Sequence, residues 1–249
     1  MLIKACLNGG TTRAQHPSVP QTPAELAADA AAAVRAGAGA IHVHPRDSSG
    51  AETLDADAVL AAVAAVRAAV PGIGVGVTTG LWVAGGDPER RMAQVSRWTG
   101  AGTGLPDFAS VNLSEPGAEE LAGLLAGQGV AVEAGIWSVA DAERLAVSGF
   151  GHSVLRILIE PQDVAPGVAV AIAANLEAAL DRHGFTAPRL HHGYGEASWH
   201  VLRAAIARDR DIRVGLEDTT VLPDGRVASG NAELVEAAVR LAGQPGPSA

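Results

Sequence analysis

Two histidines separated by a single residue are the strongest chemical signal in the sequence. His42 and His44 lie in the short apolar run Ile41-His42-Val43-His44, which is typical of a buried strand. Because side chains alternate along a strand, both imidazoles point to the same side of it. Two imidazoles on one face could hold a zinc ion or a similar divalent metal, although one buried and one surface histidine would give the same pattern.

A second charged segment could complete such a site. Another short apolar run places Arg213, Gly215 and Glu217 at alternate positions, so that they lie on the same face of the predicted strand. Asp218 is the next residue. A carboxylate there could be the third ligand, because two histidines and one carboxylate leave positions open for a substrate. The alternative is that Glu217 and Asp218 cap the next helix and interact with its dipole.

Small polar residues end two further apolar runs and could bind a substrate carboxylate. Thr78, Thr79 and Gly80 close the run that begins near residue 73, and Ser110 and Asn112 close the next one. Capping of the following helices is the common alternative for side chains of these types. These five residues are our candidates for substrate binding.

A later segment, residues 190–200, combines glycines with three histidines. Its glycines would allow the backbone to approach a ligand closely. His191 and His192 point opposite ways if they lie on a strand, so at most one of them faces the site. The alternative is a glycine turn with surface histidines.

The composition describes an acidic globular protein. The 249 residues are 48% hydrophobic and 18% charged, which excludes a disordered chain. Lys and Arg number 18 against 27 Asp and Glu, and the net charge of -9 argues against nucleic acid or an anionic membrane as the main partner. The single cysteine, Cys6, excludes an internal disulfide, and we expect a buried, inert thiol. With no signal-peptide pattern and no apolar run of about 20 residues, the sequence predicts a cytoplasmic location.

Eight short apolar runs alternate with eight alanine-rich segments. Alanine is the strongest helix former, and short apolar runs suit parallel strands that are buried on both faces. We predict strands near 2–7, 40–44, 73–77, 108–112, 130–133, 154–159, 189–192 and 212–216. We predict helices over 23–37, 55–70, 87–98, 117–127, 138–148, 166–183, 196–208 and 230–242.

Eight such units in this length predict a closed (β/α)8 TIM barrel. We expect one domain over residues 1–249, with 243–249 as a flexible tail. An open doubly wound sheet is the alternative, but no Gly-x-Gly-x-x-Gly follows the first strand. In a closed barrel the second and eighth strands both flank the first, so His42, His44 and Glu217 can converge at the mouth where barrel enzymes place their sites.

Several motifs, in their order and spacing, resemble the β-keto acid cleavage enzymes, often described as 3-keto-5-aminohexanoate cleavage proteins. The resemblance runs over nearly the whole chain, and its most specific motifs lie at the second and eighth strands. It is carried by Asn8-Gly9-Gly10, Thr11-Thr12-Arg13-Ala14, His16-Pro17-Ser18-Val19-Pro20, Thr22-Pro23, Gly37-Ala38, His42-Val43-His44-Pro45-Arg46-Asp47 and Gly215-Leu216-Glu217-Asp218.

The resemblance implies a zinc-dependent barrel that forms homo-oligomers, commonly tetramers. It implies that a β-keto acid and acetyl-CoA are converted to acetoacetate and the CoA ester of the remaining acyl fragment. By motif match, the implied metal ligands are His42, His44 and Glu217. The implied catalytic residues are Arg213 and Asp218, and the implied substrate contacts are Thr78, Ser110 and Asn112.

These residue types suit that chemistry. A β-keto acid can chelate a cation through its ketone and carboxylate oxygens, and the cation then acts as a Lewis acid. Asp218 can remove the proton between the two carbonyl groups, and Arg213 can orient Asp218.

One departure from the family bears on the substrate. The family's enzyme for an amino-keto acid carries an acidic residue in the loop after the first strand, where this chain has Gly10. We therefore expect a neutral or anionic β-keto acid. Two alternatives to acyl transfer stay open: a metal-dependent aldolase or hydrolase that acts on a keto acid without acetyl-CoA, and a non-catalytic barrel that binds a metal and a small acid.

Overall fold

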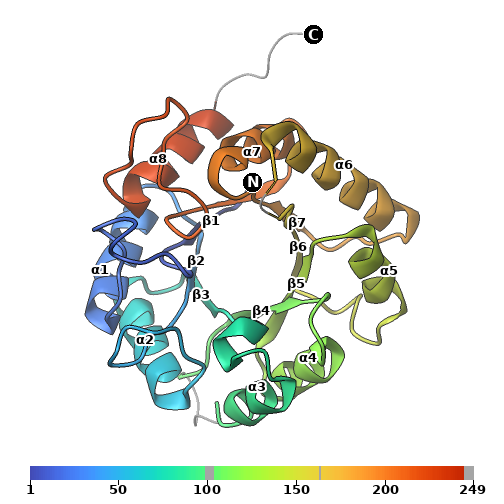
Figure 1. Ribbon diagram of the computed structural model, residues 1–249, viewed down its shortest axis with the longest axis horizontal. Helices are drawn as coiled ribbons and strands as arrows, with labels where there is room; N and C mark the ends of the chain where they lie inside the picture. The colour runs from blue at the N-terminus through green and yellow to red at the C-terminus, as the bar shows by residue number, and fades with distance from the viewer. Residues whose placement is uncertain (99–103, 163, 244–249) are drawn as a thin grey trace.

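Eight parallel strands close into a barrel in their sequence order, so the predicted (β/α)8 fold is confirmed (Figure 1). The computed structural model describes residues 1–98, 104–162 and 164–243. The predicted tail therefore lies outside the described residues, apart from Gly243. The strands are β1 (Ile3–Cys6), β2 (Ala40–Val43), β3 (Gly74–Val77), β4 (Phe108–Asn112), β5 (Ala131–Ile136), β6 (Arg156–Ile159), β7 (Arg189–His191) and β8 (Asp211–Val214).

Helices alternate with the strands and form the outer ring in Figure 1. They are α1 (Pro23–Arg35), α2 (Ala56–Ala69), α3 (Pro88–Val95), α4 (Ala118–Gly127), α5 (Val139–Val147), α6 (Pro166–Arg182), α7 (Ser198–Ile206) and α8 (Asn231–Ala242). Short 3-10 helices, η1 (Leu81–Ala84) and η2 (Gly195–Ala197), precede α3 and α7. None of the described helices is long and apolar enough to span a membrane.

Four of the described α-helices, α1, α2, α3 and α5, begin at a residue whose side chain caps the first turn. Thr22 and Ser138 each form a capping box with an acidic residue three positions later, Glu25 and Asp141. Asp87 accepts hydrogen bonds from the first backbone amides of α3. That helix ends at Val95 rather than at the predicted residue 98, because the chain turns there and buries Trp98, whose indole donates to the Leu54 carbonyl at 2.9 Å.

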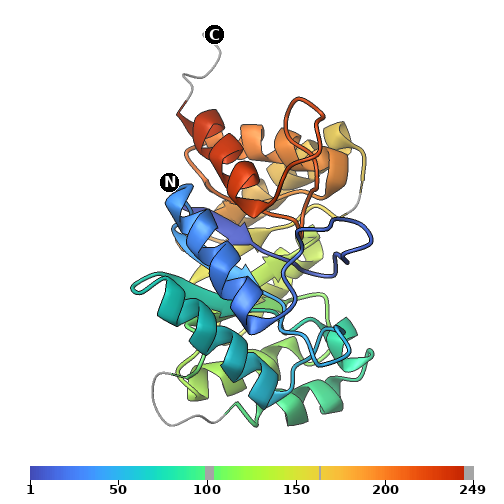
Figure 2. The same cartoon turned by 90° about the vertical axis from the view of Figure 1, so that its left-hand side faces the viewer.

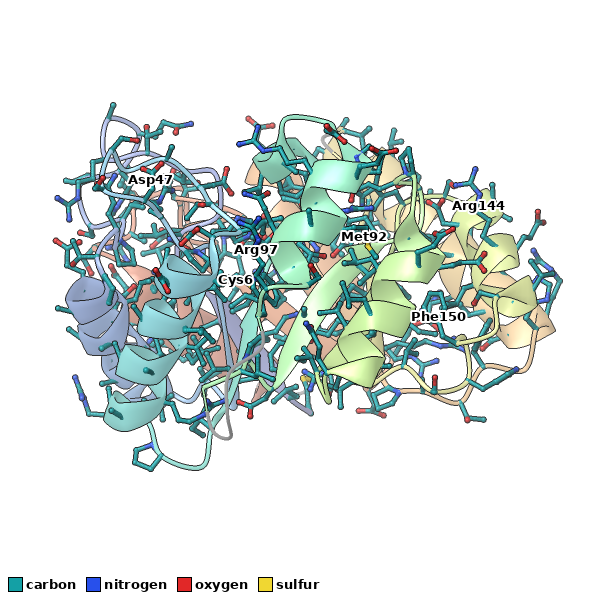
Figure 3. The ribbon with its side chains drawn as sticks, turned by 90° about the horizontal axis from the view of Figure 1, so that it is seen from below. Cys6, Asp47, Met92, Arg97, Arg144 and Phe150 are labelled. Atoms are coloured by element: carbon teal, nitrogen blue, oxygen red, sulfur yellow. The ribbon has the colours of Figure 1, made fainter. Side chains whose placement is uncertain are left out.

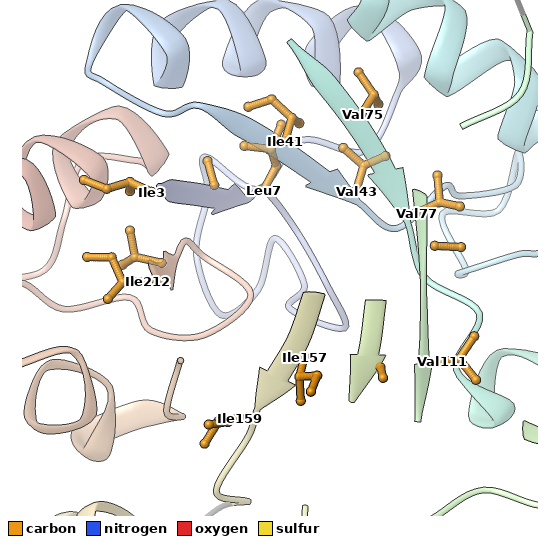
Figure 4. Packing of buried hydrophobic residues seen from close by; sticks show 14 of the residues in the cluster. Ile3, Leu7, Ile41, Val43, Val75, Val77, Val111, Ile157, Ile159 and Ile212 are labelled. Carbon is orange, nitrogen blue, oxygen red and sulfur yellow. The ribbon is translucent and has the colours of Figure 1, made fainter. Parts of the chain in front are cut away.

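Alternate strand residues pack outward against the helices. Ile41, Val43, Val75 and Val77 belong to one large buried cluster, which Figure 4 shows on the helix side of β2 and β3. The parallel register pairs Cys6 of β1 with His42 of β2. Residues of the opposite parity, His42 among them, therefore face the barrel axis.

Charged side chains fill the barrel below the mouth. The Lys4 ammonium contacts Glu133 at 2.6 Å, and Arg156 contacts the same carboxylate at 3.3 Å. Both cations lie over the ring of Phe108. Since Lys4, Glu133 and Arg156 come from β1, β5 and β6, this cluster ties opposite walls together and forms a floor under the site.

Two long loops meet at the mouth, after β1 and after β8. His16 contacts the Ala228 carbonyl at 2.8 Å, and Thr11 donates to the Leu216 carbonyl at 2.8 Å. Figure 2 shows both loops on the right-hand side of the barrel, which is the side of the strand ends. In Figure 3, Asp47 lies in the loops near the upper edge, whereas Cys6 lies well below it.

Candidate active site

The structure brings His42, His44 and Glu217 together at the mouth. Their ligand atoms all lie within 4.8 Å of one another, and His44 Nε2 is 3.3 Å from Glu217 Oε1. The strand prediction for 212–216 ran too far, because β8 ends at Val214 and a turn carries Glu217. Gly9 makes room for that carboxylate: it has a φ of +51°, and a Cβ there would lie 2.2 Å from Glu217 Cγ.

These residues fit a divalent metal. His42 Nδ1 and Glu217 Oε2 are buried, and neither has a hydrogen-bond partner among the described residues. A buried polar atom without a partner is costly, and a bound cation would satisfy both atoms. His44 contacts Glu52 through Nδ1, which leaves Nε2 on the side of Glu217. Two imidazoles and one carboxylate form a donor set typical of zinc and related metals.

The protonation states of the three residues are strongly perturbed. Burial lowers the pKa of His42 well below its usual value, so the ring is neutral. Burial also lowers the pKa of His44, but Glu217 and Glu52 outweigh it and raise the pKa to about 9. Burial raises the pKa of Glu217, yet Arg213 and His44 hold it well below its ordinary value. A metal would therefore bind in competition with a proton on His44.

Arg213 and Asp218 adjoin the three candidate ligands. Arg213 Nη2 donates to Asp218 Oδ1 at 2.7 Å, and Arg213 Nε lies 3.1 and 3.2 Å from the two Asp218 oxygens. The same Nη2 donates to Glu217 at 2.5 Å. Burial lowers the pKa of Arg213, but Asp218 raises it well above its usual value, so the guanidinium stays charged. One cation thus connects a candidate metal ligand with a candidate base.

Two buried residues without an assigned role extend this network. His192, just after β7, lies between two carboxylates: its Nδ1 is 3.3 Å from Asp218 and its Nε2 is 3.1 Å from Glu160. Glu160 directly follows β6 and accepts from the Trp137 indole at 2.8 Å. Burial lowers the pKa of His192, but Asp218 and Glu160 outweigh it and raise the pKa. An acidic residue at the end of a buried strand was the signal that could have revealed Glu160.

A family model described as beta-keto acid cleavage enzyme matches residues 1–248. The chain belongs to this family. A 3-keto-5-aminohexanoate cleavage enzyme from Fusobacterium nucleatum subsp. nucleatum is 28% identical over 99% of this chain and 92% of the relative. One from Acetoanaerobium sticklandii is 26% identical over 97% of this chain and 91% of the relative. The family resemblance inferred from the motifs is therefore confirmed.

Solved structures support the same fold. The structure described as apo ObcA has a TM-score of 0.73 and 19% identity over 90% of this chain. The ternary complex of ObcA with a C4-CoA adduct and oxalate has a TM-score of 0.71, also at 19% identity over 90% of this chain. This chain spans only 61% and 63% of those longer chains. At this identity the likeness establishes the barrel architecture alone.

The substrate candidates of this family member divide into two groups. Thr78, Ser110 and Asn112 have the inward parity of β3 and β4, so they face the barrel axis above its floor. Asn112 Nδ2 donates to Glu115 at 2.9 Å, which turns its carbonyl oxygen toward the interior side near Gly135. These three side chains could contact a substrate.

Thr79 and Gly80 have structural contacts instead. The Thr79 hydroxyl donates to the Ser110 carbonyl and so connects β3 to β4. Gly80 lies under the ring of Trp82, where a Cβ would be 2.3 Å from the indole. The Gly80 amide donates to the Thr78 hydroxyl at 3.0 Å, which helps to orient that side chain.

The segment 190–200 contributes one histidine to the mouth, in keeping with the parity argument. His192 faces Asp218, whereas His191 points outward and contacts Glu177 of α6 at 2.8 Å. The ring of Tyr194 packs edge-on against His192, with centroids 5.0 Å apart. Cys6 is buried, and burial raises its pKa well above the usual value, as expected for an inert thiol.

Proposed function

We propose that this chain is a divalent-metal-dependent enzyme that transfers an acyl group between a β-keto acid and acetyl-CoA. Its products would be acetoacetate and a new acyl-CoA. The observation that carries this proposal is the juxtaposition of the His42–His44–Glu217 triad with the Arg213–Asp218 pair. Arg213 and Asp218 are not needed merely to hold a metal, so their presence favours catalysis over simple binding. Family membership and the names of the two relatives support the keto acid as substrate.

His42, His44 and Glu217 would hold the metal, for which zinc is our first candidate. When bound, the metal supplies a Lewis acid for the ketone and carboxylate oxygens of the substrate. The residues of the chain supply the proton chemistry. Asp218 accepts the proton from the carbon between the two carbonyl groups, and Arg213 holds the Asp218 carboxylate in place for that step.

The remaining steps need no nucleophile from the protein. The substrate carbanion attacks the thioester carbon of acetyl-CoA, and the CoA thiolate leaves. The thiolate then attacks the original keto carbon, and the bond between that carbon and the former carbanion breaks. The carbanion of acetoacetate takes back the proton held by Asp218 and leaves as acetoacetate, while the remaining acyl group stays on CoA as a thioester. The buried, protonated state of Cys6 agrees with a mechanism that has no cysteine nucleophile.

We further propose a neutral or anionic β-keto acid as the substrate. Gly10 offers no charge to a substrate ammonium group. The nearest group to a Cβ at Gly10 would be Glu52 Oε2, at 3.7 Å. That carboxylate is already paired with His44. We also propose that the chain assembles as a homo-oligomer.

Acetoacetate release tests the proposal. The purified protein would receive acetyl-CoA and a panel of β-keto acids with and without an amino group, before and after chelator treatment. We expect release that needs both substrates, stops with the chelator and returns with added zinc. The variant Asp218→Asn is the matched control, because it should keep the metal and lose turnover. Turnover of a keto acid without acetyl-CoA would instead assign an aldolase or hydrolase.

A further inference from the structure

The two histidines of the candidate metal site have unequal surroundings. His44 Nδ1 contacts the Glu52 carboxylate, whereas His42 Nδ1 has no hydrogen-bond partner in the described part of the chain. Glu52 is not one of the three candidate ligands, and it lies eight residues beyond His44 in the sequence. Glu52 takes part in no step of the proposed acyl transfer.

The loop after β2 folds back so that Glu52 reaches His44. Arg46 and Glu52 form an isolated antiparallel bridge, and the Thr53 amide donates to the Pro45 carbonyl at 2.9 Å. The Arg46 guanidinium anchors the base of this loop by donating to the carbonyls of Gly9, Thr11 and Gly50 at 2.8 to 2.9 Å. The carboxylate is therefore held by a braced turn rather than by a free loop.

Trp82 covers the same pair from the loop after β3. Its ring stacks on His44 with centroids 6.3 Å apart and an interplanar angle of 26°. Because Gly80 has no side chain, the Trp82 ring can lie over the backbone at that point. The indole itself remains 51% exposed, so it forms the outer wall of the site. His44 is thus held by Glu52 at Nδ1 and by the Trp82 ring on its face.

We propose that Glu52 is a positioning residue for the metal site, which orients His44 so that Nε2 faces the metal. This inference rests on the metal site of the proposed function. An imidazole can carry its proton on either ring nitrogen, and the partner of one nitrogen decides which is free to coordinate. A carboxylate that accepts from Nδ1–H leaves Nε2 as the ligand and makes it a better donor. Outer carboxylates of this kind typically raise metal affinity by about 10- to 100-fold.

The test measures zinc affinity on the metal-free full-length protein by competition with a chromophoric chelator. We expect Glu52→Ala to bind zinc about 10- to 100-fold more weakly than the wild type. Glu52→Gln should lose less, because its amide oxygen can still accept from Nδ1–H. Glu196→Gln, an exposed glutamate in η2, is the matched control and should bind zinc as the wild type does. Thermal unfolding of the metal-free variants checks that each one is folded.

A nitrogen NMR experiment provides the second readout. In the zinc-loaded wild type, His44 should carry its proton on Nδ1, and Glu52→Ala should weaken that preference. The proposal is overturned if Glu52→Ala binds zinc within about threefold of the wild type, or if the wild type binds no zinc. Weakened zinc binding in Glu52→Ala combined with no acetoacetate release by the wild type would support this role and reject the acyl transfer.

Discussion

The Arg213 guanidinium holds both carboxylate oxygens of Asp218 through donor–acceptor distances of 2.7 to 3.2 Å. Both residues are buried, so water contributes little to the position of either group. A planar guanidinium can hold a carboxylate at two points, whereas the ammonium of a lysine is a point charge on a flexible stem. The position of the candidate base therefore depends on the shape of this cation as well as on its charge.

Arg213→Lys is expected to keep the charge and lose this alignment. A misplacement of about 1 Å can cost about 100-fold in rate, and we expect kcat/KM to fall by at least that factor. The measurement is steady-state acetoacetate release with zinc present, next to Arg97→Lys as a control away from the mouth. Activity within about fivefold of the wild type would mean that the charge alone suffices.

Glu217 and Asp218 are adjacent in sequence, but substitutions of the two residues are expected to impair activity in different ways. Glu217→Gln removes a candidate ligand, so zinc should bind more weakly and excess zinc should restore part of the activity. Asp218→Asn leaves the ligands intact, so zinc should bind normally while kcat falls by about 100- to 10,000-fold. Metal content and kcat, measured on the same preparations, separate the two roles. Loss of zinc from Asp218→Asn would place that residue among the ligands instead.

Periodicity and residue type predicted the barrel and the centre of the site. The alternation of alanine-rich and apolar runs requires only local propensity, and closure brings the second and eighth strands to either side of the first. Once the barrel closes, the shared parity of His42 and His44 places both imidazoles at the mouth. The two most specific motifs of the family resemblance provide the three candidate ligands.

The supporting residues could not be predicted in the same way. Glu52 reaches His44 because the loop after β2 forms an antiparallel bridge, which has no periodic signature. His192 and Glu160 meet because β6 and β7 are adjacent and end at the same height, which is a matter of register between strands. Thr79 was assigned to substrate by type alone, although its hydroxyl donates to the neighbouring strand.

Glu177 of α6, which contacts the outer side of β7, makes the stability of the protein sensitive to acid. It accepts from His191 at 2.8 Å and from two Arg210 nitrogens at 2.9 Å, and it also pairs with Arg189. Burial raises its pKa, but these three partners outweigh it and lower the pKa from 4.5 to about 2. The folded state therefore favours the charged carboxylate. Its contribution to stability is present above pH 4.5 and is lost as the pH falls towards 2.

Glu177→Gln is expected to remove that dependence. The variant should be less stable than the wild type at pH 7, because three basic groups lose their partner. The difference should shrink as the pH falls from 4.5 towards 2, because the unfolded wild-type chain then binds a proton at Glu177 that the folded state does not bind. Urea unfolding at a series of pH values measures both effects, and a constant difference across that range would contradict the assignment.

Asp29 of α1, which contacts Asn231 of α8, gives the stability of the protein the opposite pH dependence. Asn231 donates to Asp29 at 2.6 Å and to the Leu7 carbonyl at 2.7 Å, and it accepts from the Leu216 amide at 2.8 Å. Burial raises the pKa of Asp29 from 3.8 to about 6, although the hydrogen bond from Asn231 lowers it. The folded state thus favours the protonated acid. That stabilisation is present below pH 3.8 and is lost as the pH rises through 6.

Asp29→Asn is therefore expected to stabilise the protein at neutral pH. The amide oxygen of the new side chain can still accept from Asn231, and no buried charge has to form. We expect a higher Tm by a few degrees at pH 7.5 and a difference that disappears near pH 4. Thermal unfolding followed by circular dichroism at pH 4, 6 and 7.5 measures this, with Glu143→Gln on the exposed face of α5 as the control. An Asp29→Asn protein that is less stable than the wild type at pH 7.5 would show that the ionised carboxylate is the stabilising form.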